Sequence, residues 1–540
     1  MMLEMDCQDR QDSVQEVACD EMTRSLMVRI GCSPEAALLC GRAVAAQANG
    51  DVCLGPLTES ETNALKGMPG IECVTTEETE IGKPFVLSGR LLYTRRNWQY
   101  ERHVGRRVGK MASTVAGPPV EVPNDGPFAE MEARQRAGVE MMCNHQFALL
   151  TGGPGTGKTF AIARAVKLIR DQGREVRLGL AAPTGKAAAR VKEAMVKEAE
   201  LLGLGEIPNA TTLHSLLEPN HDLVSFRRNR RNPLPLDWLI VDEASMIDLP
   251  LMSKLLDALP DDCRLTLVGD ANQLASVEPG RVFGDLCRMP GLPKCELNVS
   301  RRFPQGGEID ILATAVNEGR GEDALKLLEN PDNELLNYEV ISEKLAFQPE
   351  AWGGFLDVVS QHLTDFARQD TEAGALEKLN GCRILCAMRH GPYGVDCLNQ
   401  FVKSKLGNKA PVPMMIVKNN HDLGVNNGDV GVVMPGDDSL YVLNEDKTIR
   451  RIPLALLPDR EMAFASTIHK AQGSEYQNVI IVLPPTPRLS EAQTLNPLLT
   501  REILYTAITR TKNKIFLFAG DTSVLACCNH AIRRQTGLGQ

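Results

Sequence analysis

The sequence predicts an α/β protein whose two main lobes are each built on a parallel β-sheet wrapped by helices. Two observations predict this class. Short apolar runs alternate with helical stretches, with candidate strands over residues 147–150, 176–181, 238–242 and 265–269. After Arg302 the alternation resumes, with candidate strands over 383–387, 463–468, 479–483 and 515–519. Because strands that alternate with helices form parallel sheets, the loops at their carboxyl ends are expected to carry the function.

Length and composition are typical of a globular protein with more than one core. The chain has 540 residues, 43% of them hydrophobic, and a formal net charge of −10. Such a length predicts two to four domains. The first residues lack the apolar stretch of a secretory signal, and no apolar run approaches the ~20 residues of a membrane span. We therefore expect a cytoplasmic protein without a membrane segment. The negative net charge argues neither for nor against nucleic-acid binding, because such binding depends on the local distribution of charge.

The fifteen cysteines invite a metal or disulfide interpretation, but no Cys-x-x-Cys pair occurs. In a cytosolic chain, such cysteines are expected to be reduced thiols that pack as small hydrophobic side chains.

Residues 1–115 are predicted to form a mainly helical N-terminal domain. Its helical region, 14–44, is expected to break between Gly31 and Pro34, and a strand pair is expected over 85–87 and 91–93. A linker rich in Pro and Gly follows at 115–127.

The stretch 93–110 is basic and contains Trp98 and Tyr100 between its charges. This pattern has two interpretations that the sequence does not separate. Aromatic rings among basic residues can bind single-stranded nucleic acid. A solvated helix that faces a partner protein has the same composition.

The strongest chemical motif follows the first candidate strand. Residues 152–159 have the spacing G-x-x-x-x-G-K-T of a phosphate-binding loop. Glycines let backbone N–H groups surround an anion, and the next helix, 159–172, directs its positive end at the phosphates. Lys158 is expected to reach the β- and γ-phosphates of ATP, and the Thr159 hydroxyl to contact Mg²⁺. The predicted cradle consists of Gly152, Gly153, Pro154, Gly155, Thr156 and Gly157.

Later residues complete the chemistry of phosphoryl transfer. Asp242 is expected to hold Mg²⁺, and Glu243 to polarise the attacking water. Gln273 follows the strand at 265–269 and is expected to sense the γ-phosphate. Arg302 and Arg510 are expected to supply positive charge from across a cleft as the transition state forms. A surface ion pair is the alternative for each arginine.

The motifs, in their order along the chain, resemble those of superfamily 1 helicases. After the phosphate-binding loop come AAPTGKA at 181–187, TTLH at 211–214, VDEAS at 241–245, GDANQLAS at 269–276, SRRF at 300–303, TIHKAQGSE at 467–475 and YTAITR at 505–510. Less generic stretches are similar to a helicase subunit of RecBCD-type helicase-nucleases, known as exodeoxyribonuclease V. They include 236–250, 385–395, 427–431 and 500–505, with 51–54 and 98–102 nearer the N-terminus.

The resemblance implies two RecA-like lobes, over 116–300 and 301–540. It places a short insert at about 217–236, where four arginines suit phosphate contacts or a solvated loop. It also implies an SH3-like barrel at about 407–457, where short β-like runs between turns independently indicate an inserted β-barrel.

Further roles are assigned by the resemblance alone. Gln135 would read the adenine edge, and Glu475 would lie near the ribose. The Ser-x-Arg-Phe pattern favours Arg302 over Arg301 as the arginine of its motif. The path of single-stranded DNA across both lobes would be lined by Thr184, Lys186, His214, Thr467 and His469.

The activity that the resemblance implies is ATP-driven 5′→3′ translocation on DNA. The chain would assemble with RecB-type and RecC-type subunits and process duplex DNA ends for recombinational repair. No nuclease site is seen in the sequence, and no single residue indicates the direction of movement along the DNA. Two alternatives stay open: a free-standing helicase of the same superfamily, and a regulatory subunit that binds ATP without driving movement.

Overall fold

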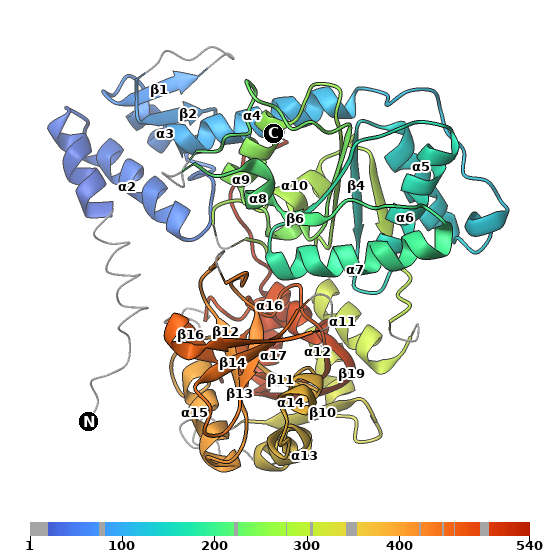
Figure 1. Cartoon of the computed structure of the whole chain (residues 1–540). Coiled ribbons are helices and arrows are strands. Elements are labelled where there is room, and N and C mark those ends of the chain that lie inside the picture. Colours follow the sequence, from blue (N-terminus) through green and yellow to red (C-terminus); the bar gives the residue numbers. More distant parts are fainter. Residues whose placement is uncertain are drawn as a thin grey trace.

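The first lobe is built on a six-stranded parallel sheet (Figure 1). The computed structural model describes residues 20–539, except 75–81, 221–224, 277, 303–305, 342–353, 421–422, 445–447, 458 and 487–495. The strands lie in the order β6-β5-β7-β8-β4-β9. Their bounds are β4 Phe147–Gly152, β5 Leu178–Ala182, β6 Ala210–Thr212, β7 Trp238–Val241, β8 Arg264–Gly269 and β9 Lys294–Leu297. The four predicted strands are confirmed, and the edge strands β6 and β9 were not predicted.

Helices cover both faces of this sheet. Alternate residues of a central strand therefore pack into two separate hydrophobic cores. Phe147 and Leu149 of β4 belong to one core, and Ala148 and Leu150 belong to the other. A strand buried on both faces is apolar throughout, which explains the continuous apolar runs in the sequence. The helices are α5 Ala133–Asn144, α6 Lys158–Asp171, α7 Gly185–Leu202, α8 Leu213–Leu217, α9 Leu249–Ala258 and α10 Val282–Arg288.

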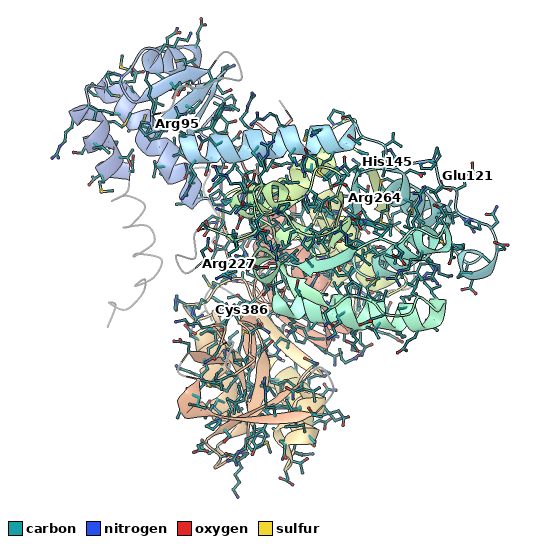
Figure 2. All side chains as sticks on the ribbon, turned by 45° about the horizontal axis from the view of Figure 1, so that its top comes forward. Arg95, Glu121, His145, Arg227, Arg264 and Cys386 are labelled. Carbon is teal, nitrogen blue, oxygen red and sulfur yellow. The ribbon has the colours of Figure 1, made fainter. Side chains whose placement is uncertain are left out.

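The second lobe has a five-stranded parallel sheet in the order β10-β19-β18-β11-β17. The strands are β10 Leu336–Val340, β11 Cys382–Cys386, β17 Ala465–Thr467, β18 Tyr476–Val482 and β19 Thr511–Ala519. Four of the five were predicted. The surrounding helices are α11 Glu308–Glu318, α12 Gly321–Leu328, α13 Phe355–Ala367, α14 Glu372–Lys378, α15 Val395–Leu406, α16 Arg501–Ile508 and α17 Asp521–Asn529. Cys386 lies at the end of this lobe that is nearest the first lobe (Figure 2).

An antiparallel sheet is inserted between β11 and β17, in the region where the sequence predicts a barrel. Its strands, in the order β15-β14-β13-β12-β16, enclose a small core that includes Ile416, Leu440 and Ile452. They are β12 Val412–Ile416, β13 Val430–Val433, β14 Ser439–Leu443, β15 Ile449–Pro453 and β16 Arg460–Met462. The insert extends beyond 457, because Met462 pairs with Met414. Closure into an SH3-like barrel stays a prediction.

The N-terminal region combines helices with a three-stranded sheet. A helix over 20–29 ends before Gly31, and α2 Pro34–Ala48 begins after Ser33, whose side chain accepts a hydrogen bond from Ala36 N. The predicted helix break is thus confirmed, while residues 14–19 lie outside the described part. The antiparallel strand pair is also confirmed, as β2 and β3. The remaining elements are α3 Glu59–Leu65, β1 Ile71–Val74, β2 Phe85–Ser88, β3 Leu91–Thr94 and α4 Arg95–Ala112.

Helix α4 contains the basic stretch with aromatic residues, and its buried face packs on α9 of the first lobe. Trp98 is only 6% exposed and joins the same core as Val104 and Met111. Arg107 donates to the carbonyl oxygens of Leu259 and Pro260 at 2.8 and 2.9 Å. Stacking of bases on Trp98 is therefore excluded, because hydrophobic packing takes up its ring. The helix anchors the N-terminal region to the lobe.

The C-terminal residues return from the second lobe to the first lobe and the N-terminal region (Figure 1). Arg534 donates to the carbonyl oxygens of Ser276 and Gly280 at 2.7 and 2.8 Å. Val52 N donates to Gln535 O at 2.9 Å, and Thr536 donates to Glu101 at 2.6 Å. The stretches 51–54 and 98–102, singled out in the sequence, therefore hold this C-terminal tail, 530–539.

Most cysteines in the described part of the chain are buried, as expected for side chains that pack as small hydrophobic groups. No helix within the described ranges is long and apolar enough to cross a membrane.

Candidate functional site

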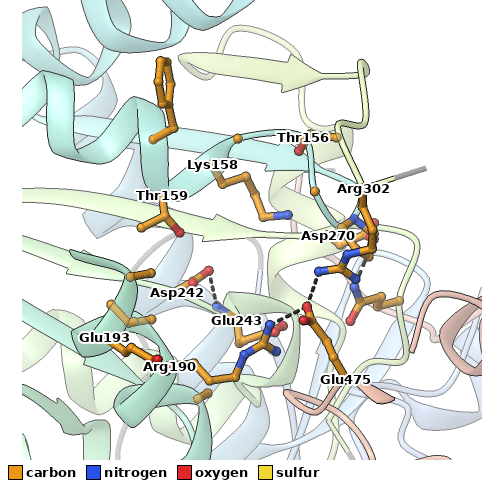
Figure 3. A pocket seen from close by; sticks show the side chains of 18 of the residues that line it. Thr156, Lys158, Thr159, Arg190, Glu193, Asp242, Glu243, Asp270, Arg302 and Glu475 are labelled. Carbon is orange, nitrogen blue, oxygen red and sulfur yellow. Dashed lines mark hydrogen bonds and ion pairs between the residues drawn. The ribbon is translucent and has the colours of Figure 1, made fainter. Parts of the chain in front are cut away.

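A cavity of about 640 Å³ lies between the phosphate-binding loop and the second lobe (Figure 3). The loop joins β4 to α6, and Gly155 and Gly157 have φ values of 77° and 85°, which favour glycine. Lys158 begins α6, and its Nζ donates to the carbonyl oxygens of Gly152 and Gly153 at 2.7 and 2.9 Å. Lys158 and Thr159 both line the cavity. The loop therefore presents an ammonium, a hydroxyl and a helix N-terminus to one space, as anion binding requires.

Two carboxylates enter the cavity from the carboxyl end of β7. Burial and the neighbouring Glu243 raise the pKa of Asp242 to about 6. Asp242 accepts a hydrogen bond from Glu243 N at 2.8 Å. Glu243 has a φ of 51°, a conformation that costs free energy in residues other than glycine. The backbone thus holds the two carboxylates side by side at the position expected for metal binding and water activation.

The carboxyl end of β8 contributes Asp270 and Gln273 to the same cavity. Gln273 Nε2 donates to Asp270 at 3.1 Å, and Tyr505 of the second lobe donates its hydroxyl to Asp270 at 2.9 Å. Burial raises the pKa of Asp270, and the charge of Lys158 opposes this rise. Gln273 Oε1 is buried without a hydrogen-bond partner in the described structure, so it can still accept one. The sequence identifies Gln273 as a site residue but not Asp270, because an aspartate directly after Gly269 is typical of an ordinary turn.

Arg510 forms part of the opposite wall. It is 2% exposed, and its guanidinium donates to the carbonyl oxygens of Thr506 and Ser474 at 3.1 and 3.3 Å. Burial lowers the pKa of Arg510. The second lobe therefore supplies a fixed, desolvated cation to the cavity, as the sequence predicted for a residue acting across a cleft.

Arg302 reaches the cavity in a different way from that predicted. Ser300 Oγ donates to Pro154 O at 3.0 Å, and Arg301 N donates to Gly155 O at 2.8 Å. The backbone of this segment thus lies on the phosphate-binding loop of the first lobe, and only the Arg302 guanidinium extends to Thr509 O, at 3.3 Å, and to Glu475. The assignment of Arg302 to the far wall is wrong, because the segment after β9 stays hydrogen-bonded to the loop. Arg301 does not line the cavity and lies 3.7 Å from Glu132. Phe303 lies outside the described residues.

Glu475 sits among three cations. Arg190 and Arg302 both bond its Oε1 (Figure 3). Lys512 Nζ lies 3.3 Å from Oε2. Burial alone would raise the pKa of Glu475, but these charges lower it to about 2. The sequence did not single out Arg190 or Lys512. The ribose contact expected for Glu475 stays a prediction, while the observed contacts give it an electrostatic role between the lobes.

Gln135 lies against the phosphate-binding loop but does not line the cavity. Its side chain donates to Thr156 O at 3.4 Å and accepts from Glu132 N at 3.3 Å. Its contact with adenine stays a prediction.

The residues predicted to line a DNA path come from both lobes. Thr184 caps α7 by accepting a hydrogen bond from Ala187 N at 3.3 Å, and Lys186 lies in the first turn of that helix. Thr467 ends β17, and His469 follows it. The start of α7 contacts the 467–475 segment: a Cβ atom placed on Gly473 would lie 3.7 Å from the Cβ atom of Ala187.

His214 lies in α8, two residues after Thr212 of β6, which pairs with Ala182 at the end of β5. Its ring lies 5.8 Å from that of Phe226 in the basic insert. In the insert Arg228 pairs with Glu218 at 2.7 Å, and Arg227 lies near the boundary of the two lobes in the view of Figure 2. Residues 221–224 of the insert lie outside the described part.

Two protein-family models match parts of this sequence. An AAA domain matches residues 135–279, and a UvrD-like helicase C-terminal domain matches residues 462–518. The RecBCD enzyme subunit RecD of Mycolicibacterium smegmatis is 37% identical over 486 residues, which cover 85% of this chain and 84% of that protein. The chain belongs to the RecD family.

Two further matches have lower sequence identity. An ATP-dependent RecD2 DNA helicase of Deinococcus radiodurans is 30% identical over 81% of this chain and 58% of its own length. A solved structure of two Pif1 helicases that unwind forked DNA has a TM-score of 0.39 and 16% identity, over 72% of this chain and 92% of that one.

The side chains of this RecD-family cleft fit a magnesium ion that arrives with a nucleotide. Among the described residues, no cluster of three or more His, Cys, Asp or Glu could hold a metal ion by itself. Mg²⁺ bound with a nucleotide needs no such cluster, because it takes one or two protein oxygen ligands together with phosphates and waters. The buried carboxylate of Asp242 and the hydroxyl of Thr159 both line the cavity and offer such oxygens.

Proposed function

We propose that this chain, an ATP-dependent DNA helicase of the RecD family, moves 5′→3′ along single-stranded DNA. It would do so as a subunit beside RecB-type and RecC-type partners, at duplex DNA ends. The observation that carries the proposal is the cleft itself. Lys158 of the first lobe and Arg510 of the second line one cavity, so hydrolysis at that point can alter the contact between the lobes.

Each residue of the cleft takes a role that its chemistry suits. Thr159 and Asp242 would hold Mg²⁺, which would neutralise charge on the phosphates when bound. Glu243 would polarise the attacking water, and Gln273, with a free buried acceptor, would respond to the γ-phosphate. Arg510 would stabilise the transition-state charge.

Arg302 would join Arg510 in this role from the first-lobe side. Its guanidinium bonds the carboxylate of Glu475. To contact the nucleotide, Arg302 would have to release this carboxylate and bond phosphate oxygens in its place.

The outer parts of the molecule receive assignments of the same kind. Residues 116–300 and 301–540 would act as RecA-like lobes, with the antiparallel insert as an SH3-like module. The region 1–115 would contact the partner subunits. Thr184, Lys186, Thr467 and His469 would contact the DNA strand near the meeting point of α7 and the 467–475 segment, and His214 would contact it beside the basic insert.

Strand displacement tests the proposal directly. Duplexes with either a 5′ or a 3′ overhang would be mixed with the chain and ATP, alone and with RecB-type and RecC-type subunits. We expect displacement of the 5′-overhang substrate only, and a loss of at least about 100-fold in Lys158→Gln. Displacement that prefers the 3′ overhang, or that persists in Lys158→Gln, would contradict the proposal. Failure to co-elute with the partner subunits would favour a free-standing helicase, and partner-bound chain without displacement would favour a regulatory subunit.

A further inference from the structure

Arg190 joins the two lobes inside the cleft. It lies on α7 of the first lobe, and its Nη1 donates to the carbonyl oxygen of Gly473 at 2.9 Å. Its Nη2 bonds the carboxylate of Glu475 (Figure 3). One guanidinium therefore holds two points of the second lobe, a carbonyl and a carboxylate that lie two residues apart in the chain.

Both segments joined by Arg190 also reach toward the predicted DNA path. On α7, Thr184 and Lys186 occupy the first turn, and Arg190 follows Lys186 by about one turn. A helix is stiff over this distance, so a displacement of its first turn moves Arg190 as well. In the second lobe, Thr467 and His469 precede Gly473 and Glu475 in one short segment.

Glu475 connects Arg190 to Arg302, one of the two arginines that would stabilise the transition state. The Oε1 atom that bonds Arg190 also bonds Arg302. Two guanidinium groups that bond the same carboxylate oxygen compete for it. When one of them moves closer to the oxygen, the hydrogen bond of the other becomes weaker. The position of Arg190 therefore sets how firmly Glu475 retains Arg302, and hence how readily Arg302 turns to a phosphate.

We propose that Arg190 is the positioning residue through which DNA binding and nucleotide binding affect each other. The inference rests on the proposed function, since it requires that the chain binds both ligands. Occupation of the DNA path moves the start of α7 against the 467–475 segment, and Arg190 passes this movement to Glu475 and Arg302. The reverse path operates when a nucleotide engages Arg302.

The geometry explains why an arginine serves here. Its planar guanidinium carries several donors in a fixed fork, so it bonds Gly473 O and Glu475 at fixed angles. A lysine would keep the charge but is a single flexible point donor. Arg190→Lys therefore separates charge from geometry, and we expect it to preserve only part of the coupling.

Reciprocal binding measures this role without relying on catalysis. The dissociation constant of a fluorescent oligothymidylate would be measured by anisotropy on the full chain, with and without a non-hydrolysable ATP analogue and Mg²⁺. The ratio of the two constants is the coupling factor, and allosteric factors are typically about 5–150-fold. We expect such a factor in the wild type, a factor within about twofold of one in Arg190→Ala, and an intermediate value in Arg190→Lys.

A matched control is Arg320→Ala. Arg320 is an exposed arginine that pairs with Glu318 at 2.7 Å and with Asp323 at 2.8 Å, and it does not line the cavity. We expect the wild-type coupling factor in this variant. Arg190→Gln, which keeps a side chain of moderate length, takes the place of Arg190→Ala if the latter does not fold.

The outcomes separate the inference from the proposed function. A wild-type coupling factor in Arg190→Ala and Arg190→Gln would overturn the inference, even if either variant bound ATP more weakly, because Arg190 would then be only a nucleotide contact. A wild-type chain that binds neither the oligonucleotide nor the analogue would instead overturn the proposed function. In a double-mutant cycle, Glu475→Gln should lower the factor by itself and add little to Arg190→Ala. Fully additive effects of the two substitutions would also contradict the inference.

Discussion

Replacing Glu243 by glutamine should separate ATP binding from ATP hydrolysis. Glu243 lies in the left-handed region, with φ at 51°. Glutamine has nearly the same volume and the same backbone preferences, so the substitution adds neither strain nor a cavity. The negative charge of Glu243 is one cause of the raised pKa of Asp242. Its removal lowers that pKa, and Asp242 should therefore hold a metal ion at least as well as before.

The expected loss of turnover follows from the role of a general base. Positioned proton transfer contributes about 10²–10⁴-fold to a rate, or about 3–5 kcal/mol of transition-state stabilisation. We expect Glu243→Gln to lose ATP hydrolysis by this factor and to bind a fluorescent ATP analogue within about threefold of the wild type. Equilibrium binding beside a phosphate-release assay, both with saturating single-stranded DNA, measures the two quantities.

Glu193→Gln is the matched control, since Glu193 is an exposed glutamate that lines the same cavity. It should keep both binding and turnover. Loss of nucleotide binding in Glu243→Gln would show that Glu243 has a structural role, and turnover near the wild-type value would remove it from catalysis.

Two further predictions concern stability. The pKa of Glu475 is lowered to about 2 from its ordinary value of 4.5, so its ion pairs stabilise the fold above pH 4.5 and cease to do so near pH 2. The difference in free energy of unfolding between wild type and Glu475→Gln should thus be constant from about pH 6 to 8 and shrink below about 4.5, as urea denaturation across pH would measure; a difference that grows on acidification would contradict this. Arg534→Ala should cost about 1–3 kcal/mol, since the carbonyl oxygens of Ser276 and Gly280 lose their charged donor. Unfolding in urea would show it, and an unchanged midpoint would mean that the tail does not stabilise the first lobe.

Local motifs explain why much of the nucleotide site could be predicted from the sequence. The phosphate-binding loop and the Asp242–Glu243 pair are each contiguous, and each follows an apolar strand, so their placement at the carboxyl edge of a parallel sheet follows from periodicity. The central strands were predictable for the same reason, since strands buried on both faces are apolar throughout. Edge strands such as β9 are partly exposed, and their sequences are too polar and short to stand out.

Contacts between distant segments explain what the sequence did not show. Arg190 is an ordinary arginine in a helical pattern, and its partners Gly473 and Glu475 lie more than 280 residues further along the chain. Arg302 was placed on the wrong wall because chain order suggests the second lobe, whereas backbone hydrogen bonds hold its segment on the phosphate-binding loop. The sequence left base stacking on Trp98 open because it does not reveal which face of α4 is buried.

The central claim is that a triphosphate binds between Lys158 and Arg510, and a crystal structure of the full chain with Mg²⁺ and a non-hydrolysable ATP analogue tests it most directly. We predict that Lys158 Nζ exchanges the carbonyl oxygens of Gly152 and Gly153 for phosphate oxygens, and that the Arg510 guanidinium faces the γ-phosphate within about 3.2 Å. A nucleotide bound outside this cleft, or a γ-phosphate that Arg510 does not face, would contradict the account.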